Sequence, residues 1–221
     1  MWPWVPDISL AAKFRDDSAE TDAMTWLQPI TLTGPGVRLE PLEQRHCGDL
    51  IEAVKDGELW RLWYTSIPAP EKMEAEIDRR RGLQASGSML PFAVIDAATG
   101  KAAGMTTYMN VDAAHKRVEI GSTWYRRSAQ RTPINTQCKL LLLTHAFESL
   151  GCIAVEFRTH FFNHASRRGI ERLGAKLDGI LRSHQRASDG TLRDTCVYSI
   201  IASEWPTVKS HLNWQLSRPR E

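Results

Sequence analysis

The segment from Val118 to Leu173 constrains the fold of this chain more than any other part. Its first stretch, Val118 to Tyr125, predicts a strand. A short basic loop follows, and then a leucine-rich stretch, Asn135 to Leu150, with the wide apolar face of a helix. Residues 155–159 predict a second strand, which leads through another short loop into a helix over His164 to Leu173. We therefore expect strands and helices to alternate in this part of the chain.

The rest of the sequence supplies further strands and helices around this unit. Alternating or apolar stretches bounded by turn residues predict the strands, and apolar residues at helical spacing predict the helices. The expected strands are 37–42, 90–95, 103–109, 176–182 and 193–201, and the expected helices are 44–54, 70–85 and 204–212. This order predicts an α/β (α+β) fold, in which one mixed sheet is covered by helices on both faces.

Composition limits the kinds of protein this chain can be. A chain of 221 residues can bury a core without disulfides or metal, and 42% hydrophobic and 24% charged residues are ordinary values for a globular protein. Lysine and arginine total 28 against 26 acidic residues, a balance too even to indicate nucleic acid as a partner. No apolar run is long enough for a membrane span, so we expect no membrane partner.

The cysteines and the first residues indicate the compartment. Cys47, Cys138, Cys152 and Cys196 are widely spaced and form no C-x-x-C motif, which favours buried free thiols in a reducing environment. Residues 1–12 contain two prolines and an aspartate but no basic region, unlike a secretory signal. We therefore expect a cytoplasmic protein.

Residues 1–30 read as an N-terminal extension, and residues 31–221 read as one domain. The extension carries Trp2, Trp4 and Trp26 among scattered acidic residues and shows no long period. Because a large aromatic side chain can bury about 150–250 Å², we expect it to dock on its own domain or on a second subunit. A homodimer formed through these tryptophans, or through the edge of the last strand, is one expectation.

The loop before the leucine-rich helix has features of an anion site. Residues 126–136 contain three arginines, whose forked donors suit phosphate oxygens, and Asn135 or Thr136 is placed to cap the helix. A helix N-terminus adds unpaired N–H groups and a partial positive charge. On these residues alone, a solvated basic loop remains the alternative.

Four stretches together carry a family resemblance. The most specific is Asn163 to Ala175, where an asparagine and a serine precede a short helix that ends in Glu-x-Leu-Gly. The others are Val37–Leu42, Val118–Tyr125, and the loop at Gln130 with the His-Ala-Phe-Glu sequence at 145–148. Over residues 37–201 the chain resembles the GCN5-related N-acetyltransferases (GNAT), and within them the RimJ/RimL-like branch.

The resemblance implies a GNAT-type twisted sheet with acetyl-CoA as cosubstrate. Two central parallel strands, 119–125 and 155–159, would splay apart, and backbone groups of the first would pair with the pantetheine arm as an added strand does. The loop at 130–136 would cradle the pyrophosphate, and Asn163 would hydrogen-bond the donor. The residues implied in binding are Thr123, Trp124, Tyr125, Gln130, Arg131, Thr132, Pro133, Ile134, Asn135, Thr136 and Asn163.

The function implied is transfer of an acetyl group from acetyl-CoA to a primary amine, on a protein N-terminus or a small molecule. Three positions depart from the family pattern. Pro133 replaces a glycine and has no N–H, Asn135 replaces a small residue, and Ile170 stands where many members place a tyrosine that protonates the leaving thiolate. These departures leave open an alternative, a non-catalytic GNAT-fold binding or scaffold protein with a degenerate CoA loop.

Glu119 and Ser166 are the candidate catalytic residues. An aliphatic ammonium has a pKa near 10, so a base or a water chain must remove a proton from the acceptor. Glu119 lies on the strand that would flank the thioester; an ion pair with Arg117 or Arg158 is the alternative. Ser166 is the candidate acid for the departing thiolate, with helix capping as the alternative. A backbone N–H near Thr123 or Trp124 would polarise the carbonyl.

Aromatic residues after the first helix are candidates for the acceptor site. Trp60, Trp63 and Tyr64 lie in a loop where this family usually receives its substrate, and their rings could hold an amine by cation–π contact, with core packing as the alternative. His160 and His164 have metal-like spacing, but no carboxylate completes the set, so we expect no metal. The run 79–81, three arginines, predicts a solvated helix face, with contact to an acidic substrate as the alternative.

Overall fold

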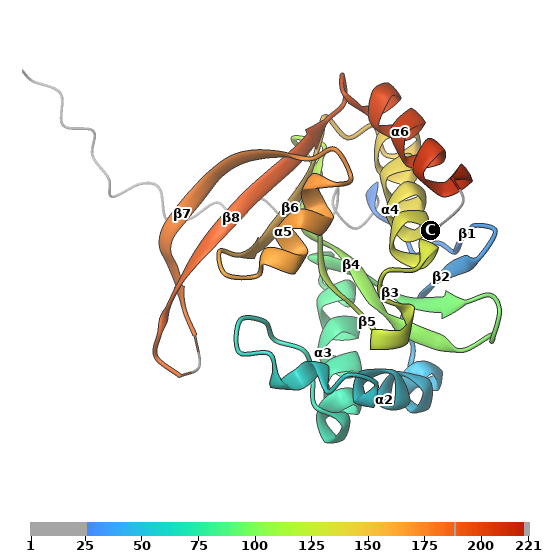
Figure 1. Ribbon diagram of the computed structural model, residues 1–221, viewed down its shortest axis with the longest axis vertical. Coiled ribbons are helices and arrows are strands. Elements are labelled where there is room, and N and C mark those ends of the chain that lie inside the picture. The colour runs from blue at the N-terminus through green and yellow to red at the C-terminus, as the bar shows by residue number, and fades with distance from the viewer. Residues whose placement is uncertain (1–25, 188, 219–221) are drawn as a thin grey trace, which may run out of the picture.

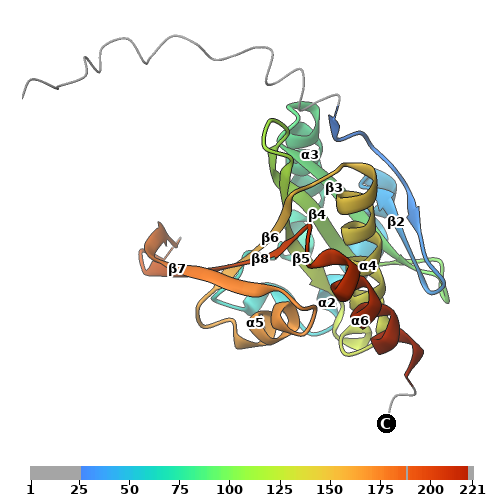
Figure 2. The ribbon, with the colours of Figure 1, turned by 90° about the horizontal axis from the view of Figure 1, so that it is seen from above.

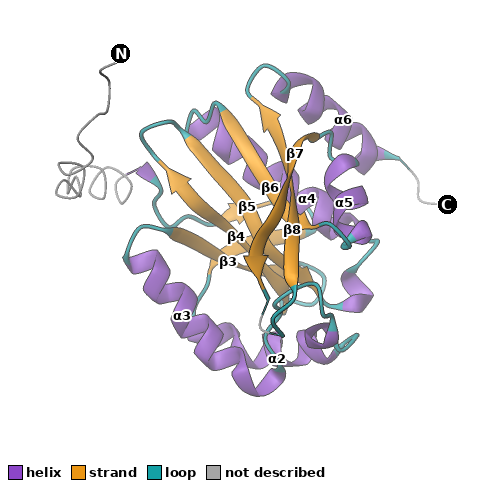
Figure 3. Ribbon diagram, turned by 90° about the vertical axis from the view of Figure 1, so that its left-hand side faces the viewer, coloured by secondary structure: helices purple, strands orange, loops and turns teal. Residues whose placement is uncertain are grey.

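The computed structural model describes residues 26–187 and 189–218 of the chain. Its strands form one eight-stranded sheet in the order β1-β2-β3-β4-β5-β6-β8-β7 (Figure 1, Figure 3). Neighbouring strands are antiparallel except β5 and β6, which are parallel. The strands are β1 (Leu32–Thr33), β2 (Val37–Pro41), β3 (Met89–Asp96), β4 (Ala102–Asp112), β5 (Arg117–Tyr125), β6 (Ala154–His160), β7 (Lys176–Arg186) and β8 (Leu192–Ile201). A single mixed sheet was expected, and the topology confirms it.

Helices cover both faces of the sheet, and each face has its own apolar core. The helices are α2 (Cys47–Lys55), α3 (Met73–Ala85), α4 (Pro133–Thr144), α5 (His164–Glu171) and α6 (Trp205–Ser217). Side chains of α4, α5 and α6 pack into the larger core, and side chains of α2 and α3 pack into the smaller one (Figure 1, Figure 2). We call the two sides of the sheet the α4 face and the α2/α3 face.

The leucine-rich helix begins earlier than its sequence suggests. Thr132 is the N-cap, its Oγ1 accepting a hydrogen bond from the Ile134 N–H at 3.4 Å, and Pro133 occupies the first helical turn. Asn135 and Thr136, the expected caps, therefore lie inside the helix. A proline fits this position because the first helical N–H has no intrahelical acceptor in any case. After Thr144 the helix widens into one π-helical turn, His145–Ser149.

Two further elements differ from expectation. The last two strands form a longer ribbon than predicted, and β7 stands exposed at the edge of the sheet (Figure 2). The two-residue strand β1 was not predicted. The last strand, β8, lies between β6 and β7, so it has no free edge for the expected dimer contact. Dimerisation itself stays a prediction.

The arginine run in α3 is not uniformly solvated, as the sequence had suggested. Arg80 is only 2% exposed and pairs with Glu76 at 2.7 Å. It also donates to Thr107 Oγ1 at 2.8 Å and to the Ser122 carbonyl at 3.4 Å. Arg80 thus ties α3 to the middle of β4 and β5.

The parallel strands separate after three residues. Arg117, Val118 and Glu119 pair with residues 154–156, and the ladder then ends. A β-bulge in β5 accompanies the separation: Met105 pairs with Trp124 and Thr107 with Gly121, so two steps along β4 match three along β5. Such a bulge bends and twists a strand. The two central strands are therefore splayed, as expected.

The bulge also reverses which way the side chains of β5 point. Ser122 adopts the left-handed conformation, with φ of 47°. Before it, Ile120 packs into the core of the α4 face; after it, Trp124 packs into the core of the α2/α3 face and Tyr125 into that of the α4 face. One strand thus presents Glu119 to one face and Thr123 to the other.

Trp26 docks on the domain. Its Nε1 donates to the Leu150 carbonyl at 3.0 Å, and Lys116 Nζ lies 4.8 Å from the centre of its ring. Trp2 and Trp4 lie outside the described residues. Within the part that is described, no helix is long and apolar enough to cross a membrane.

Candidate active site

The site predicted from the sequence lies where β5 and β6 diverge. Beyond Glu119, the edge of β5 that faces β6 has no partner strand among the described residues, so its backbone N–H and C=O groups can pair with an extended ligand. Thr123 and Tyr125 point to the α4 face from this segment, and Trp124 points to the opposite core.

Glu119 is buried on the α2/α3 face, next to this opening. Its side chain is 6% exposed, and Asn110 Nδ2 donates to its Oε2 at 2.6 Å. Burial raises the pKa of Glu119 above its ordinary value, although the Asn110 amide and the Arg158 guanidinium oppose this effect. A carboxylate of this kind takes up a proton more readily than an exposed one.

Both arginines considered as ion-pair partners of Glu119 bind Glu156 more closely. Arg117 Nη2 lies 2.6 Å and Arg158 Nη2 lies 2.9 Å from Glu156 carboxylate oxygens, whereas the contact from Arg158 Nε to Glu119 is 3.5 Å. Despite its partial burial, these hydrogen bonds hold the pKa of Glu156 below its usual value. The two carboxylates therefore differ in environment: the pKa of Glu156 is lowered, and the pKa of Glu119 is raised.

The loop before α4 is tied down by its own polar side chains. Gln130 Nε2 donates to the Tyr125 carbonyl at 3.1 Å, and Thr132 Oγ1 donates to the Ala129 carbonyl at 2.6 Å. Arg131 has a left-handed backbone, with φ of 61°.

The first turn of α4 offers fewer backbone donors than most helices. Ile134 N–H is used by the cap, Pro133 has none, and helix geometry leaves the Asn135 N–H without an intrahelical acceptor. The Thr136 hydroxyl is buried and accepts a hydrogen bond from Arg172 at 3.2 Å. Of the residues predicted at the phosphate loop, Asn135 thus presents the clearest backbone donor.

Asn163 and Ser166 stand at the start of α5. Asn163 is the N-cap, with its Oδ1 accepting from the Ser166 N–H at 3.0 Å. Ser166 contributes its backbone to the cap, and its hydroxyl makes no hydrogen bond within the described residues. Ile170 is 8% exposed and packs in the core of the α4 face, so the position of the expected tyrosine is filled by an apolar contact.

The three predicted acceptor aromatics separate into two groups. Trp60 packs against the core of the α2/α3 face. Trp63 is 63% exposed and makes edge contacts with Tyr64 and with His160, at centroid distances of 5.6 and 5.2 Å. The loop between α2 and α3 thereby reaches the end of β6 (Figure 1). Phe162, also exposed, joins the same cluster.

A buried lysine beside the opening was not singled out in the sequence. Lys139 of α4 is 5% exposed, and its Nζ donates to Thr123 Oγ1 at 3.0 Å and to Thr106 Oγ1 at 3.4 Å. Burial lowers the pKa of this amine to about 8. In the sequence, only its position next to Cys138 and three to four residues before Leu142 and Leu143 indicates that Lys139 points inward.

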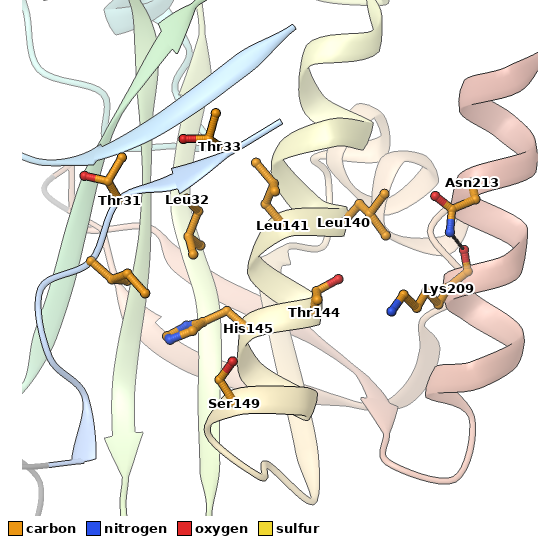
Figure 4. A pocket seen from close by; sticks show the side chains of 11 residues that line it. Thr31, Leu32, Thr33, Leu140, Leu141, Thr144, His145, Ser149, Lys209 and Asn213 are labelled. Atoms are coloured by element: carbon orange, nitrogen blue, oxygen red, sulfur yellow. Dashed lines mark hydrogen bonds between the residues drawn. The ribbon is translucent and has the colours of Figure 1, made fainter. Parts of the chain in front are cut away.

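A separate hollow of about 380 Å³ lies on the α4 face between β1, α4 and α6 (Figure 4). Leu32, Leu140, Leu141 and Lys209 are among its lining residues. It contains none of the residues predicted for binding or catalysis. The described residues also contain no cluster of three or more histidines, cysteines or carboxylates able to hold a metal.

Comparison with known proteins identifies the family of this chain. Residues 37–176 match the family model of the acetyltransferase (GNAT) domain. A GCN5-related N-acetyltransferase from Brucella melitensis shares 33% sequence identity and superposes with a TM-score of 0.77, over 86% of this chain and 87% of that chain. No curated protein matches the sequence.

Two more distant structures share the fold. RimJ of Mycobacterium smegmatis, solved in complex with CoA-disulfide, is 22% identical, with a TM-score of 0.72 over 86% of this chain and 96% of its own. RimL, a ribosomal L7/L12 alpha-N-protein acetyltransferase, is 18% identical, with a TM-score of 0.69 over 79% of this chain and 96% of its own.

Proposed function

Because this chain belongs to the acetyltransferase (GNAT) domain family, whose members use an acyl-CoA donor, we propose that it transfers an acetyl group from acetyl-CoA to a primary amine. The acceptor is the N-terminus of a protein or a small-molecule amine. The observation that carries this proposal is the juxtaposition of an unpaired β5 edge with the buried carboxylate of Glu119.

The residues at the opening fit the donor. The unpaired edge of β5 at Thr123, Trp124 and Tyr125 supplies backbone groups for the pantetheine arm. The start of α4 supplies the Asn135 N–H, the helix dipole and the nearby Arg131 for the pyrophosphate. Gln130, Thr132, Pro133, Ile134 and Thr136 shape this loop, and Asn163 borders the opening from α5. The donor supplies the activated acyl group, and the protein supplies the backbone and charged groups that position the donor.

Glu119 acts as the base. Amines that attack carbonyl carbons must be neutral, and at neutral pH an aliphatic amine is mostly protonated. A carboxylate with a raised pKa accepts that proton, directly or through a water molecule. Asn110 holds the carboxylate in place through Oε2, the same oxygen that receives the weaker contact from Arg158.

Ser166 is the proposed proton donor to the departing thiolate. Its hydroxyl has no other hydrogen bond among the described residues, and Ile170 cannot fill this role. On the other side of the opening, Trp63 and Tyr64 border the path of the acceptor, with Trp60 anchoring their loop to the core. The alternative of a non-catalytic scaffold draws no support from Pro133, since its place at the start of α4 suits the helix itself.

Thermal unfolding with and without acetyl-CoA tests the proposal. Ligand binding to the native state raises the melting temperature by mass action, so a shift at micromolar to millimolar acetyl-CoA is expected. Thiol release in the presence of a panel of amines then reports turnover. No shift at millimolar acetyl-CoA, together with no thiol release, would overturn the proposal.

A further inference from the structure

The sheet places Arg193 on the same face as Glu119. Glu119 lies opposite Glu156 in the parallel pair, and His160 lies opposite Thr195 in the antiparallel pair of β6 with β8. Residues directly opposite one another share a face, and so do residues two apart on one strand. Arg193, two residues from Thr195, therefore belongs to the face where the acceptor is proposed to enter.

The side chain of Arg193 makes no hydrogen bond or ion pair with any described residue. Its Nε is buried and lacks an acceptor, and burial lowers the pKa of its guanidinium. Arginine carries five N–H donors and stays charged in proteins, so an unpaired, half-buried guanidinium is an uncommon arrangement.

The other arginines of this cluster have close carboxylate partners. Arg117 and Arg158 both bind Glu156, and Arg117 also lies opposite Asp112 of β4, on whose carboxyl group it acts electrostatically. Among the described residues, the carboxylate that acts electrostatically on Arg193 is Glu119, which makes no hydrogen bond or ion pair with it. A carboxylate of a ligand would supply the hydrogen-bond acceptor that the Arg193 guanidinium lacks.

Other charged groups close to Arg193 are already engaged. Asp194 binds Arg182 at 2.6 Å and the Ser183 N–H at 2.7 Å, and His184 Nδ1 lies 3.1 Å from Thr195 Oγ1. His160 accepts a hydrogen bond from the Phe162 N–H, and burial lowers the pKa of its ring. None of these neighbours therefore supplies a carboxylate that pairs with Arg193.

We propose that Arg193 binds a carboxylate of the acceptor, so that the amine acetylated by this enzyme carries an acidic group close to its reacting nitrogen. This inference rests on the function proposed above and narrows its substrate class. A forked guanidinium recognises a carboxylate through two parallel hydrogen bonds, which fix orientation as well as charge. The carboxylate comes either from the α-carboxyl group of a free amino acid or from an acidic side chain near a peptide N-terminus.

Paired acceptors test the proposal and separate the two sources. Alanine and phenylalanine are compared with their amides, and two peptides are compared that differ only by aspartate or asparagine at the second residue. In one of these two comparisons, the wild-type enzyme is expected to show a KM at least about tenfold lower for the acidic member. A difference between the amino acids and their amides identifies the α-carboxyl group, and a difference between the two peptides identifies the acidic side chain.

Variants distinguish binding from a merely electrostatic effect on Glu119. In Arg193→Gln, the KM of the acidic acceptor should rise to that of its neutral partner. Both enzymes are compared at a pH above the acidic limb of kcat, because Arg193 lowers the pKa of Glu119 and its removal moves that limb to higher pH. Arg193→Lys should restore part of the preference. Arg186→Gln is the matched control, because it removes one exposed arginine of β7 that binds the Gly190 carbonyl.

Four outcomes would overturn the inference. Three are equal KM for acidic and neutral acceptors in the wild type, no reaction with any acidic acceptor, and a preference that survives Arg193→Gln. The fourth is a fall in kcat of Arg193→Gln for both members of a pair, which would show that Arg193 acts on Glu119 instead. Each of these leaves the proposed function standing as long as acetyl-CoA shifts the melting temperature and a neutral amine is acetylated.

Discussion

Glu119 and Glu156 show how two carboxylates of one face acquire different chemistry. Glu156 receives two arginines and stays ionised, whereas Glu119 has an amide and one distant guanidinium as partners, and burial raises its pKa. Paired groups whose environments push their pKa values apart mark acid–base sites. This contrast supports two predictions about turnover.

Replacing Glu119 by glutamine should abolish most turnover without affecting donor binding. Glutamine keeps the size of the side chain but cannot accept the proton, so kcat should fall by about 10²- to 10⁴-fold. The dissociation constant for acetyl-CoA, measured by calorimetry, should stay the same. Glu148→Gln, which removes a surface carboxylate paired with Lys209, is the control. Unaltered kcat in Glu119→Gln would remove this residue from the role of base.

The pH dependence of kcat should follow the carboxyl group of Glu119. Its pKa is raised, so kcat should fall as the pH drops through a midpoint above 4.5, the ordinary value. Glu156→Gln removes a negative neighbour that raises this pKa and releases Arg158 to pair with Glu119. The acidic limb should therefore move to lower pH in that variant. A limb that stays in place would contradict this account.

Lys139 should make the protein less stable at neutral pH than at alkaline pH. Its pKa falls from 10.5 in the unfolded chain to about 8 when folded, so folding costs about 3 kcal/mol below pH 8, and this cost disappears as the pH rises toward 10.5. Lys139→Met should therefore raise the free energy of unfolding at pH 7 and much less at pH 10. Denaturant unfolding at both pH values measures this, with Lys101→Met on an exposed turn as the control. An equal change at both pH values would show that packing, and not charge, dominates.

At the scale of the elements, the order of strands and helices follows from periodicity, but their ends and distortions do not. The stretch 118–125 predicts β5 almost to the residue, because it is rich in the β-branched and aromatic residues that favour strands. The residue pattern of β5 does not indicate the extra residue at Ser122, because a bulge arises from the way that a strand pairs with its neighbour, here β4. Helix α4 begins two residues before the predicted Asn135, because Pro133 lacks an N–H but is a favourable first-turn residue.

The candidate site was partly predictable for the same reason. Glu119, Asn163 and Ser166 fall on motifs that lie within single elements. Arg193 does not, because its neighbours depend on the register between β6 and β8, which are separated in the chain by α5 and β7. Arg80 was read as solvated because a run of charges hides the single position that faces the sheet.

Pro133 provides a test of the helix start as a donor site. Pro133→Ala adds one N–H to the first turn, so the dissociation constant for acetyl-CoA should fall several-fold, while the melting temperature changes little. Pro206→Ala in the first turn of α6 is the matched control and should leave acetyl-CoA binding unchanged. Weaker binding in Pro133→Ala would indicate that the rigid backbone of proline matters more than the added hydrogen.

At the scale of the whole molecule, the proposed function has the two substrates approach from opposite faces of one sheet. The pyrophosphate site proposed at α4 and the charged face around Glu119 meet only where β5 and β6 separate (Figure 1). Both substrates can therefore be bound at once, and the amine can attack directly.

Direct transfer predicts a ternary complex. None of the four cysteines is a ready nucleophile, because burial raises the pKa of Cys138 and of Cys152 to about 12 and raises those of Cys47 and Cys196 as well. Initial-rate plots at several concentrations of both substrates should intersect. Parallel lines, or an acetylated protein detected by mass spectrometry after incubation with acetyl-CoA alone, would contradict this mechanism.

Because of its extra residue, the shape of β5 depends on how many residues the strand contains and little on which residue stands at position 122. Deleting Ser122 would remove the bulge and restore strict alternation, with Thr123 and Tyr125 still on the α4 face and Trp124 still on the other. Strand β5 would, however, lose the bend that accompanies its separation from β6. No point substitution has that effect. Natural relatives that keep the activity should therefore vary in the identity of this residue but conserve the count of residues between the base and the end of the strand.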